Sequence, residues 1–487
     1  MIKKLLAHSS IYMTGEILVM AGGLISFPII ARLLSQEAYG MMVIISTTIL
    51  LAEAVSSGGL HHASLRFYSK YQETDENKNF YSTLIFGSIA FGTAGTLFAF
   101  ILLKTLSTFY YVSEDIRIIF FLALPLILIR IVTHIFGSLY RIREKPGTYV
   151  SFSILNKYVG LGLIVLFLAL MHLGLFGYYL GLVLGELTIL LAYWYFISRD
   201  LGYSLNCFST PILKEATQYG FPLVFSGLAG TLLASSDRYL IGHFMTKADV
   251  AIYSVPYNLC SYLSGILTSG FEFALIPIIM NEWNKGLMDK VHLELQRVIR
   301  LYCMAAFPIV AGVCAVGRQI IVLLASDKYA DAHYILPFII FGVMIQGLLT
   351  PLMMGLVFSN STRQIASMTW QAAMLNIIMN LFLIPEFGLY GAAVSTLFCY
   401  AILALVGAIR SHKHFQIEMP WIPIAPYALA ALLMYGMLKS ILLYFPNADL
   451  PTQIGTGIVC YLGLIFTFDV KFRSMAFTQW HALMKSK

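Results

Sequence analysis

The chain has few charged residues for its length. Of its 487 residues, 11% are charged and 59% are hydrophobic, with a mean hydropathy of +0.79. Soluble domains average about a quarter charged residues, so a soluble globular protein is excluded. The short segments of alternating polarity that a membrane β-barrel requires are also absent. The apolar residues fall instead into runs of about 20, the length of a membrane-spanning helix, which predicts an all-α polytopic membrane protein.

Signals for metal sites and enzyme chemistry are also missing. The six cysteines are scattered without a CxxC pair, which argues against a disulfide framework or a zinc site. The sequence contains no phosphate-binding GxxxxGK[ST] loop, no HExxH and no nucleophile elbow, and its loops are too short for a catalytic domain. We therefore predict a protein that is not an enzyme and has no metal and no cofactor. The net charge is +7, but the basic residues lie in short loops between apolar runs, where they set membrane topology. We therefore expect no nucleic-acid partner.

The apolar runs predict about fourteen transmembrane helices. A first set of six occupies residues 1–197, and a polar connector follows at 198–215. A second set of six lies within 216–410, and residues 411–487 hold a further connector, a last pair of spans and a tail. The expected spans are at about 11–33, 40–60, 81–103, 116–139, 150–172, 174–196, 216–242, 250–280, 297–324, 332–358, 365–385, 388–410, 422–443 and 452–470.

The basic residues are distributed unevenly over the predicted loops. The N-terminus, the even-numbered loops and the C-terminal tail hold most of the 31 lysines and arginines. The odd-numbered loops hold Lys104, Arg117, Lys247, Arg318, Lys328 and Lys439. Cytoplasmic loops carry the excess of lysine and arginine, so both termini are predicted to be cytoplasmic, which agrees with an even number of spans.

Phrases of the first half recur in the second half. A shift of 211 residues places 34–36 on 245–247, and a shift of 214 places Gly174-Leu175-Phe176-Gly177 on Gly388-Leu389-Tyr390-Gly391. Six spans followed by six similar spans, each set starting from the cytoplasm, form a parallel repeat. Such a repeat predicts two six-helix lobes, an N-lobe and a C-lobe, with a cleft between them.

Three of these phrases carry a resemblance to a known family. They are IARLLSQEAYGMMVI at 30–44, SSDRYLIGHFMTKADVAIYSVPYNL at 235–259 and NIIMNLFLIPEFGLYGAAVST at 376–396. Together they resemble the polysaccharide-unit flippases of O-antigen and exopolysaccharide synthesis. These flippases form the polysaccharide transporter branch of the multidrug/oligosaccharidyl-lipid/polysaccharide exporter superfamily. The resemblance covers roughly residues 1–410, and the last two spans fit the fourteen-span members.

The resemblance implies a function and a location. It implies translocation of undecaprenyl-pyrophosphate-linked oligosaccharide across the bacterial inner membrane, by lobes that alternate between inward-open and outward-open states. It also implies coupling to a proton or sodium gradient, contact with membrane lipid, and work alongside other membrane proteins of polysaccharide assembly. A pyrophosphate head requires a wet, cationic cleft, and arginine suits it because its fork binds phosphate bidentately.

Three basic residues are expected to contact the substrate. Arg130 lies inside the fourth span, Lys157 lies early in the fifth, and Arg66 follows the second span. Intramembrane charges usually serve function, but each residue also has a structural interpretation. Arg130 could form a buried ion pair with Glu186 or Glu53, and Arg66 and Lys157 could extend to the interface.

The candidates for ion coupling are five acids, because a buried carboxylate can carry a proton. They are Asp237, Glu53, Glu186, Glu272 and Glu16. Each could equally be a paired structural acid.

Two further arginines are predicted to be structural or gating residues. Arg32 is expected to cap the end of the first span. Arg238 follows Asp237 directly, and adjacent helical residues point about 100° apart, so we expect each to find its partner elsewhere. The histidines His61, His62 and His134 lack metal-ligand companions and are interpreted as packing or interface residues.

Two alternative functions remain open. A multidrug cation antiporter of the same superfamily would have an acidic cleft, whereas Arg130, Lys157 and Arg66 are cationic. Glu16 in the first span keeps this alternative open. A membrane glycan polymerase would be expected to carry a long loop outside the membrane, which this sequence lacks.

Overall fold

The fold is given by a computed structural model of the chain. It describes residues 2–74, 76–109, 114–445, 449–469 and 473, and the side chains of 2–9, 106–109 and 270–274 lie outside the description. Within these ranges every regular element is a helix. Contacts between Cα atoms divide the chain into two compact units. Unit 1 comprises Met1–Ser254 and Thr369–Gly388, and unit 2 comprises Val255–Met368 and Leu389–Lys487.

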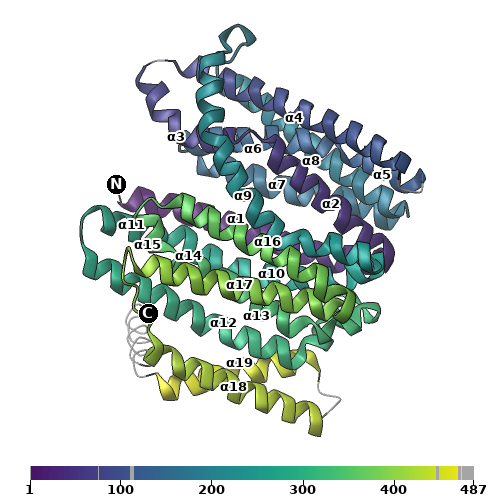
Figure 1. Cartoon of the computed structure of the whole chain (residues 1–487), viewed down its shortest axis with the longest axis vertical. Coiled ribbons are helices and arrows are strands. Elements are labelled where there is room, and N and C mark those ends of the chain that lie inside the picture. Colours follow the sequence, from purple (N-terminus) through teal and green to yellow (C-terminus); the bar gives the residue numbers. More distant parts are fainter. Residues whose placement is uncertain (1, 75, 110–113, 446–448, 470–472, 474–487) are drawn as a thin grey trace, which may run out of the picture. The chain divides into compact units, whose positions relative to one another are not determined.

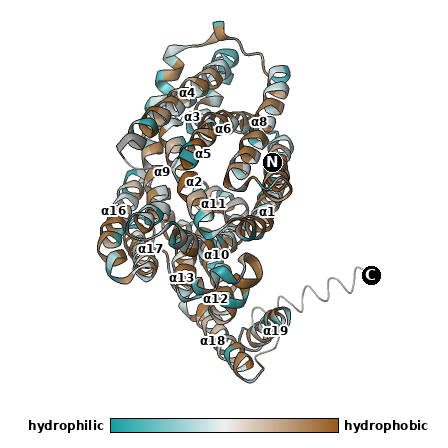
Figure 2. Cartoon of the chain, turned by 90° about the vertical axis from the view of Figure 1, so that its right-hand side faces the viewer, coloured by the Kyte–Doolittle hydropathy of each residue, from teal (hydrophilic) through white to brown (hydrophobic). Residues whose placement is uncertain are grey.

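Helices occupy all fourteen segments predicted as spans. Eleven helices of the described residues are long and apolar enough to cross a membrane, or up to twelve if the bent pair Asp327–Tyr334 and Leu336–Gly347 counts as one span. The helices at the seventh and eighth predicted spans are not among them. Large apolar side chains such as Phe98, Phe382 and Ile422 are exposed, and hydrophobic residues cover much of the helices in Figure 2. The chain is therefore a multi-pass, all-helical membrane protein.

Unit 1 is built mainly from the first half of the chain. Its elements are α1 (Ile2–Leu33), α2 (Gln36–Ser56), α3 (Leu60–Glu73), α4 (Asn77–Phe109), α5 (Glu114–Ala123), α6 (Pro125–Ile142), α7 (Pro146–Val165), the π-helix η1 (Leu166–Leu170), α8 (Gly174–Asp200), the 3-10 helix η2 (Leu205–Cys207) and α9 (Thr210–Phe244). The start of α10 (Lys247–Ala274) and the second part of α16 (Thr362–Phe387) also belong to it.

Unit 2 contains the remaining helices. They are α11 (Ile276–Asn284), α12 (Met288–Ala325), the 3-10 helix η3 (Asp327–Tyr334), α13 (Leu336–Gly347), α14 (Leu349–Leu352), α15 (Met354–Phe358), α17 (Leu389–His412), α18 (Trp421–Tyr444) and α19 (Leu450–Phe468). Here α9 groups with unit 1, whereas the repeat places residues from 216 onward in the C-lobe. The lobes inferred from the repeat therefore stay a prediction.

The repeated phrases adopt matching local conformations. The Ser35 hydroxyl accepts a hydrogen bond from the Ala38 amide at 3.2 Å and caps α2. In the same way, the Thr246 hydroxyl accepts one from the Asp249 amide at 3.2 Å before α10. Gly174 and Gly388 both have positive φ, 55° and 56°, at the start of α8 and just before α17. The sequence repeat is thus also a repeat of helix boundaries.

Helix α6 lies at the centre of unit 1. It packs against α2, α3, α4, α5, α7 and α8, and Figure 1 shows it between α4 and α8. One side of it contributes buried residues such as Phe136, Leu139 and Tyr140 to an apolar core shared with α3, α4, α7 and α8. Since this core fixes one side of α6, the polar residues on its other side are held in defined positions.

Candidate functional site

Unit 1 contains a polar cavity of about 360 Å³. It is lined from α1, α3, α6, α7 and α8, and its charged and titratable residues are Glu16, His61, His134, Arg141, Tyr149, Lys157 and Tyr193. Ser153, Asn156, Thr133 and Ser138 add polar groups. Small-molecule sites have volumes of about 300–1,000 Å³, so this cavity can hold a head group.

Arg141 is the arginine that reaches this cavity. It lies in the last turn of α6, where its Nη2 donates to the Ser138 hydroxyl at 3.2 Å. Its guanidinium lies 5.0 Å from the centre of the Tyr149 ring. The buried Nε has no hydrogen-bond partner among the described protein atoms. Buried polar groups are almost always hydrogen-bonded, so this N–H is available to a ligand or to solvent.

Two more polar atoms of the same cavity share this property. The Thr133 hydroxyl and the Asn156 Oδ1 are buried and have no partner among the described protein atoms. Lys157 provides the second cation, and its Nζ donates to the Ser26 hydroxyl at 3.3 Å. The cavity therefore combines two cations with several unsatisfied donors and acceptors, which is the chemistry that binds a hydrated anion.

A smaller cavity of about 80 Å³ lies in the same unit. It is lined by Glu53, Ala54, Ser57, His61, Ile131, His134 and Ile135. His61 and His134 line both cavities. The buried Glu53 carboxylate on α2 approaches His134 Nδ1 on α6 to 3.4 Å.

Arg130 has a different environment from Arg141. Its Nη2 and Nε donate to the two carboxylate oxygens of Glu186 on α8, at 2.7 and 2.9 Å. This bidentate pair joins α6 to α8, and Glu186 is buried. The pairing is one of the two structural interpretations that the sequence left open for Arg130. The substrate-binding interpretation stays a prediction.

The remaining candidates are dispersed. Arg66 on α3 and Arg32 in the last turn of α1 are exposed and do not line either cavity of unit 1. Glu16 on α1 lines the larger cavity. Glu272 lies outside the described side chains.

Asp237 and Arg238 contact each other, contrary to the expectation from their adjacency. Asp237 Oδ1 accepts the Arg238 amide at 2.8 Å and lies 3.5 Å from Arg238 Nη1. The expectation that these two side chains do not pair was wrong, because the long arginine side chain folds back along its helix. Arg238 also has a partner elsewhere, since its Nη1 donates to the Ala234 carbonyl at 2.5 Å. Next to them, Ser236 of α9 donates to Asn376 Oδ1 of α16 at 3.1 Å, and Asp237 itself is wholly buried.

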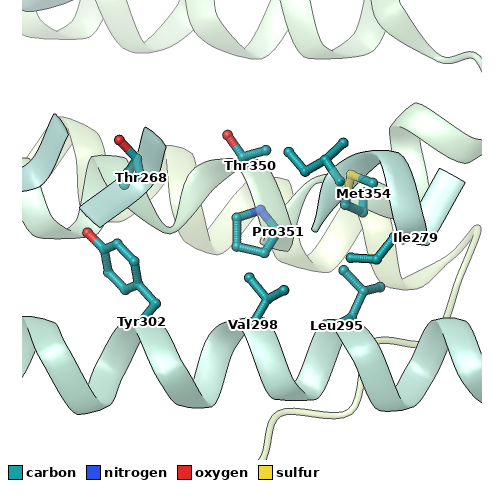
Figure 3. A pocket seen from close by; sticks show the side chains of 10 residues that line it. Thr268, Ile279, Leu295, Val298, Tyr302, Thr350, Pro351 and Met354 are labelled. Atoms are coloured by element: carbon teal, nitrogen blue, oxygen red, sulfur yellow. The ribbon is translucent and has the colours of Figure 1, made fainter. Parts of the chain in front are cut away.

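Unit 2 has a pocket of another kind. It has a volume of only about 20 Å³, with space for about one water molecule. In Figure 3, Leu295, Val298 and Tyr302 project from α12 toward Thr350, Pro351 and Met354. An ionic head group does not fit such a small, mostly apolar space.

Sequence reasoning missed Arg141, His61 and His134. Arg141 follows the fourth expected span, which ends at about residue 139, and the histidines are interpreted as packing or interface residues. A signal was nevertheless present, because Arg130, His134, Ser138 and Arg141 follow each other at spacings of four, four and three residues. Such spacings place polar residues on one face of a helix.

The chain matches known proteins along much of its length. A family model described as polysaccharide biosynthesis protein matches residues 29–334. A probable low-salt glycan biosynthesis flippase, Agl15 of Haloferax volcanii, is 21% identical over 49% of this chain and 52% of its own length. The probable flippase AglR of the same organism is 23% identical over 49% of this chain and 51% of its own length. The chain spans about half the length of these curated relatives.

Two solved structures share the fold. The lipid II flippase MurJ, in an inward closed conformation, has a TM-score of 0.77 and 15% identity, over 96% of this chain and 99% of the MurJ chain. A multidrug resistance MATE family transporter in an inward-facing conformation has a TM-score of 0.64 and 15% identity, over 84% of this chain and 98% of its own. At this identity the likeness establishes the fold alone.

Proposed function

Because the chain belongs to the family of polysaccharide biosynthesis proteins, we propose that it is a flippase that moves a lipid-linked oligosaccharide from one membrane leaflet to the other. Agl15 is named as a probable glycan biosynthesis flippase and AglR as a probable flippase. Of the chains that share the fold, MurJ is named as a lipid II flippase and the MATE chain as a multidrug resistance transporter. These names support a transporter and not an enzyme.

The proposed substrate is an undecaprenyl-pyrophosphate-linked oligosaccharide repeat unit. One observation carries this proposal: Arg141 Nε, Thr133 Oγ1 and Asn156 Oδ1 are buried around one cavity and have no hydrogen-bond partner among the residues that the structure describes. A pyrophosphate can accept from the arginine and the hydroxyl, while sugar hydroxyls can donate to the amide oxygen. Lys157 adds a second positive charge. The cavity suits a diphosphate with its first sugar, while the lipid tail stays in the bilayer.

The proposed transport cycle is alternating access of two six-helix lobes. It involves fourteen spans with both termini in the cytoplasm, and it moves the head group to the periplasmic leaflet of the bacterial inner membrane. The matched helix starts at Ser35 and Thr246 support the parallel repeat on which the lobes depend. Arg130 and Arg66 stay proposed substrate contacts outside the cavity, and Arg32 and Arg238 stay proposed structural or gating residues. Other membrane proteins of polysaccharide assembly are proposed as partners.

The cycle is proposed to be coupled to a proton or sodium gradient. The candidate acids are Asp237, Glu53, Glu186, Glu272 and Glu16, because a carboxylate inside a membrane protein can bind either ion. Replacing each acid by its amide in reconstituted protein, with transport measured against imposed gradients, identifies the coupling acid. Transport that follows the gradient in all five variants would contradict coupling through these residues.

A multidrug cation antiporter is the second candidate function. The MATE fold and the acids Glu16 and Glu53 at the two cavities favour it. Arg141 and Lys157 oppose it, since two cations in the larger cavity repel a cationic drug. A glycan polymerase is the third candidate and has less support.

Lipid-linked saccharides in cells with and without the gene test the proposal. A flippase predicts that single repeat units accumulate on the cytoplasmic leaflet of the deletion strain and that surface polysaccharide is lost. Unchanged lipid pools together with new sensitivity to cationic dyes would overturn the flippase in favour of the antiporter. Single units that reach the outer face without being polymerised would indicate the polymerase.

A further inference from the structure

The larger and the smaller cavity of unit 1 share two histidines in their walls. His61 on α3 and His134 on α6 each line both the cavity of about 360 Å³ and that of about 80 Å³. The His134 side chain is 62% exposed even though α6 is surrounded by six helices, because it faces this interior space. Both cavities exceed the volume of about 10–15 Å³ that one water molecule requires. Two titratable side chains are therefore shared by the walls of the two cavities.

A carboxylate contacts this histidine pair. Glu53 lines only the smaller cavity, and its Oε1 lies 3.4 Å from His134 Nδ1. The other acids of the region have different environments: Glu186 is held bidentately by Arg130, and Glu16 lines only the larger cavity. Among the described side chains, Glu53 is the one coupling candidate whose carboxylate lies within 4 Å of a histidine nitrogen.

Several charged and titratable groups surround Glu53, His61 and His134. Arg130 and Glu186 act electrostatically on Glu53, and Arg141, Arg130 and Glu186 act on His134. His62 and Arg141 act on His61, and the ring centres of His61 and His62 are 3.8 Å apart. From α1, α7 and α8, the larger cavity receives Glu16, Lys157, Tyr149 and Tyr193. Among the described residues, α4, α5 and α9 place no charged side chain on either cavity.

From this arrangement we propose that His61, His134 and Glu53 form a proton-transfer site between the two cavities of unit 1. A protonated His134 transfers the proton on its Nδ1 to the Glu53 carboxylate, which becomes a neutral carboxylic acid. Glu53 then releases this proton to water of the smaller cavity and becomes a carboxylate again, while a hydronium ion in the larger cavity reprotonates His134 through His61. The step leaves total charge unchanged. It moves one positive charge away from the cavity that contains Arg141 and Lys157.

This site deepens the proposed function and rests on it, since it makes the coupling ion a proton. An anionic head group bound at Arg141 favours protonated histidines beside it, because opposite charges attract in a low-dielectric interior. Removing the proton to Glu53 weakens that attraction. Binding and release of the head group are thereby linked to the passage of a proton through the smaller cavity.

The first test requires no transport. Infrared difference spectra of the purified full-length protein between neutral and acidic pH report protonation of single carboxyl groups. We expect one carbonyl-stretch band to be lost in Glu53→Gln and its pH midpoint to move in His134→Gln. His62→Gln is the matched control, because His62 neighbours His61 but lines neither cavity, and it should leave the band in place. A spectrum of Glu53→Gln identical to that of the natural protein would overturn the proposal.

The second test measures proton movement. The full-length protein is reconstituted into phosphatidylethanolamine–phosphatidylglycerol vesicles with a trapped pH-sensitive dye, and undecaprenyl pyrophosphate is added as the probe. We expect proton flux to fall at least about tenfold in Glu53→Gln and His134→Gln, as for the loss of an acid–base group, and to persist in His62→Gln. Unchanged flux in Glu53→Gln, alongside lipid translocation, would refute the proton site and leave the flippase standing. Absence of translocation with the Glu53 infrared band intact would refute the flippase alone.

Discussion

Arg130 and Arg141 lie about three turns apart on one face of α6, but their surroundings differ. The Arg130 guanidinium is neutralised by Glu186, whereas the buried Nε–H of Arg141 has no hydrogen-bond partner in the part of the chain that the structure describes. The sequence identified Arg130 because it is isolated within an apolar run. Arg141 lies near the end of that span, where a cation is typical of a loop, and only its helical spacing from Arg130, His134 and Ser138 points to a shared face. Which cation is paired depends on the contact between α6 and α8, which local sequence does not encode.

The Arg130–Glu186 pair gives a prediction at this scale. Arg130→Gln leaves the buried Glu186 without its partner and should lower the free energy of unfolding by about 3 kcal/mol. The double variant Arg130→Gln/Glu186→Gln should recover most of that loss, as measured by thermal unfolding of the purified full-length protein. If Arg130 also contacts the substrate, transport should stay low in the double variant. Full transport by the double variant would show that Arg130 serves only as the structural partner of Glu186.

Two glycines allow the chain to break between helices α2 and α3. Gly58 and Gly59 have positive φ of 57° and 69°, which β-carbons disfavour. Gly59 lies so close to α9 that a Cβ on it would be 2.3 Å from the Gly220 carbonyl oxygen. The sequence predicted one span from 40 to 60. It did not predict the close approach of α9, because Gly220, which Gly59 contacts, lies far away in the sequence.

Two glycines of α9 provide a matched test of this approach. A Cβ on Gly220 would lie 2.5 Å from the Gly59 carbonyl oxygen, whereas a Cβ on Gly227 would meet nothing within 4 Å. Gly220→Ala should therefore lower the free energy of unfolding by about 1–3 kcal/mol through overpacking. Gly227→Ala should have little effect or slightly stabilise the helix. Equal unfolding midpoints for the two variants would show that α3 and α9 are not in close contact.

The last two helices are attached to α12 by a buried polar cluster. Arg300 Nε donates to the Tyr427 hydroxyl of α18 at 2.7 Å, and its Nη2 donates to Asp469 at the end of α19. Tyr427 in turn donates to Asp469 Oδ2 at 2.5 Å. The sequence predicted a last pair of spans within residues 411–487, but the residues that anchor the pair to α12 could not be found from periodicity, since they are distant in sequence.

Removal of this anchor should loosen the pair. Arg300→Gln should increase the rate of proteolysis in the connector at 413–420, because α18 and α19 lose a charge-assisted hydrogen bond worth about 1.5–3 kcal/mol. Arg297→Gln is the control, since Arg297 lies one turn earlier on α12 in an exposed pair with Glu294. Equal cleavage rates in the two variants would contradict an anchoring role for Arg300.

At the scale of the whole molecule, composition and hydropathy were sufficient to predict an all-helical membrane protein, and helices occupy each predicted span. The prediction succeeded because a bilayer permits few structures besides apolar helices. The cavity was not predictable to the same degree. It forms where five helices of unit 1 converge, and hydropathy records how apolar a helix is but not which face meets which neighbour.

The proposed role of the cationic cavity of unit 1 is to carry the head group of a lipid-linked saccharide. It is tested most directly by the rate at which an undecaprenyl-pyrophosphate-linked oligosaccharide becomes accessible on the far leaflet of vesicles that contain the full-length protein. The natural protein and Arg199→Gln, which changes an exposed arginine stacked on Tyr195, should translocate at similar rates. Arg141→Gln should be slower by about tenfold or more, the loss expected for one charged hydrogen bond. Equal rates for Arg141→Gln and the natural protein would contradict the account.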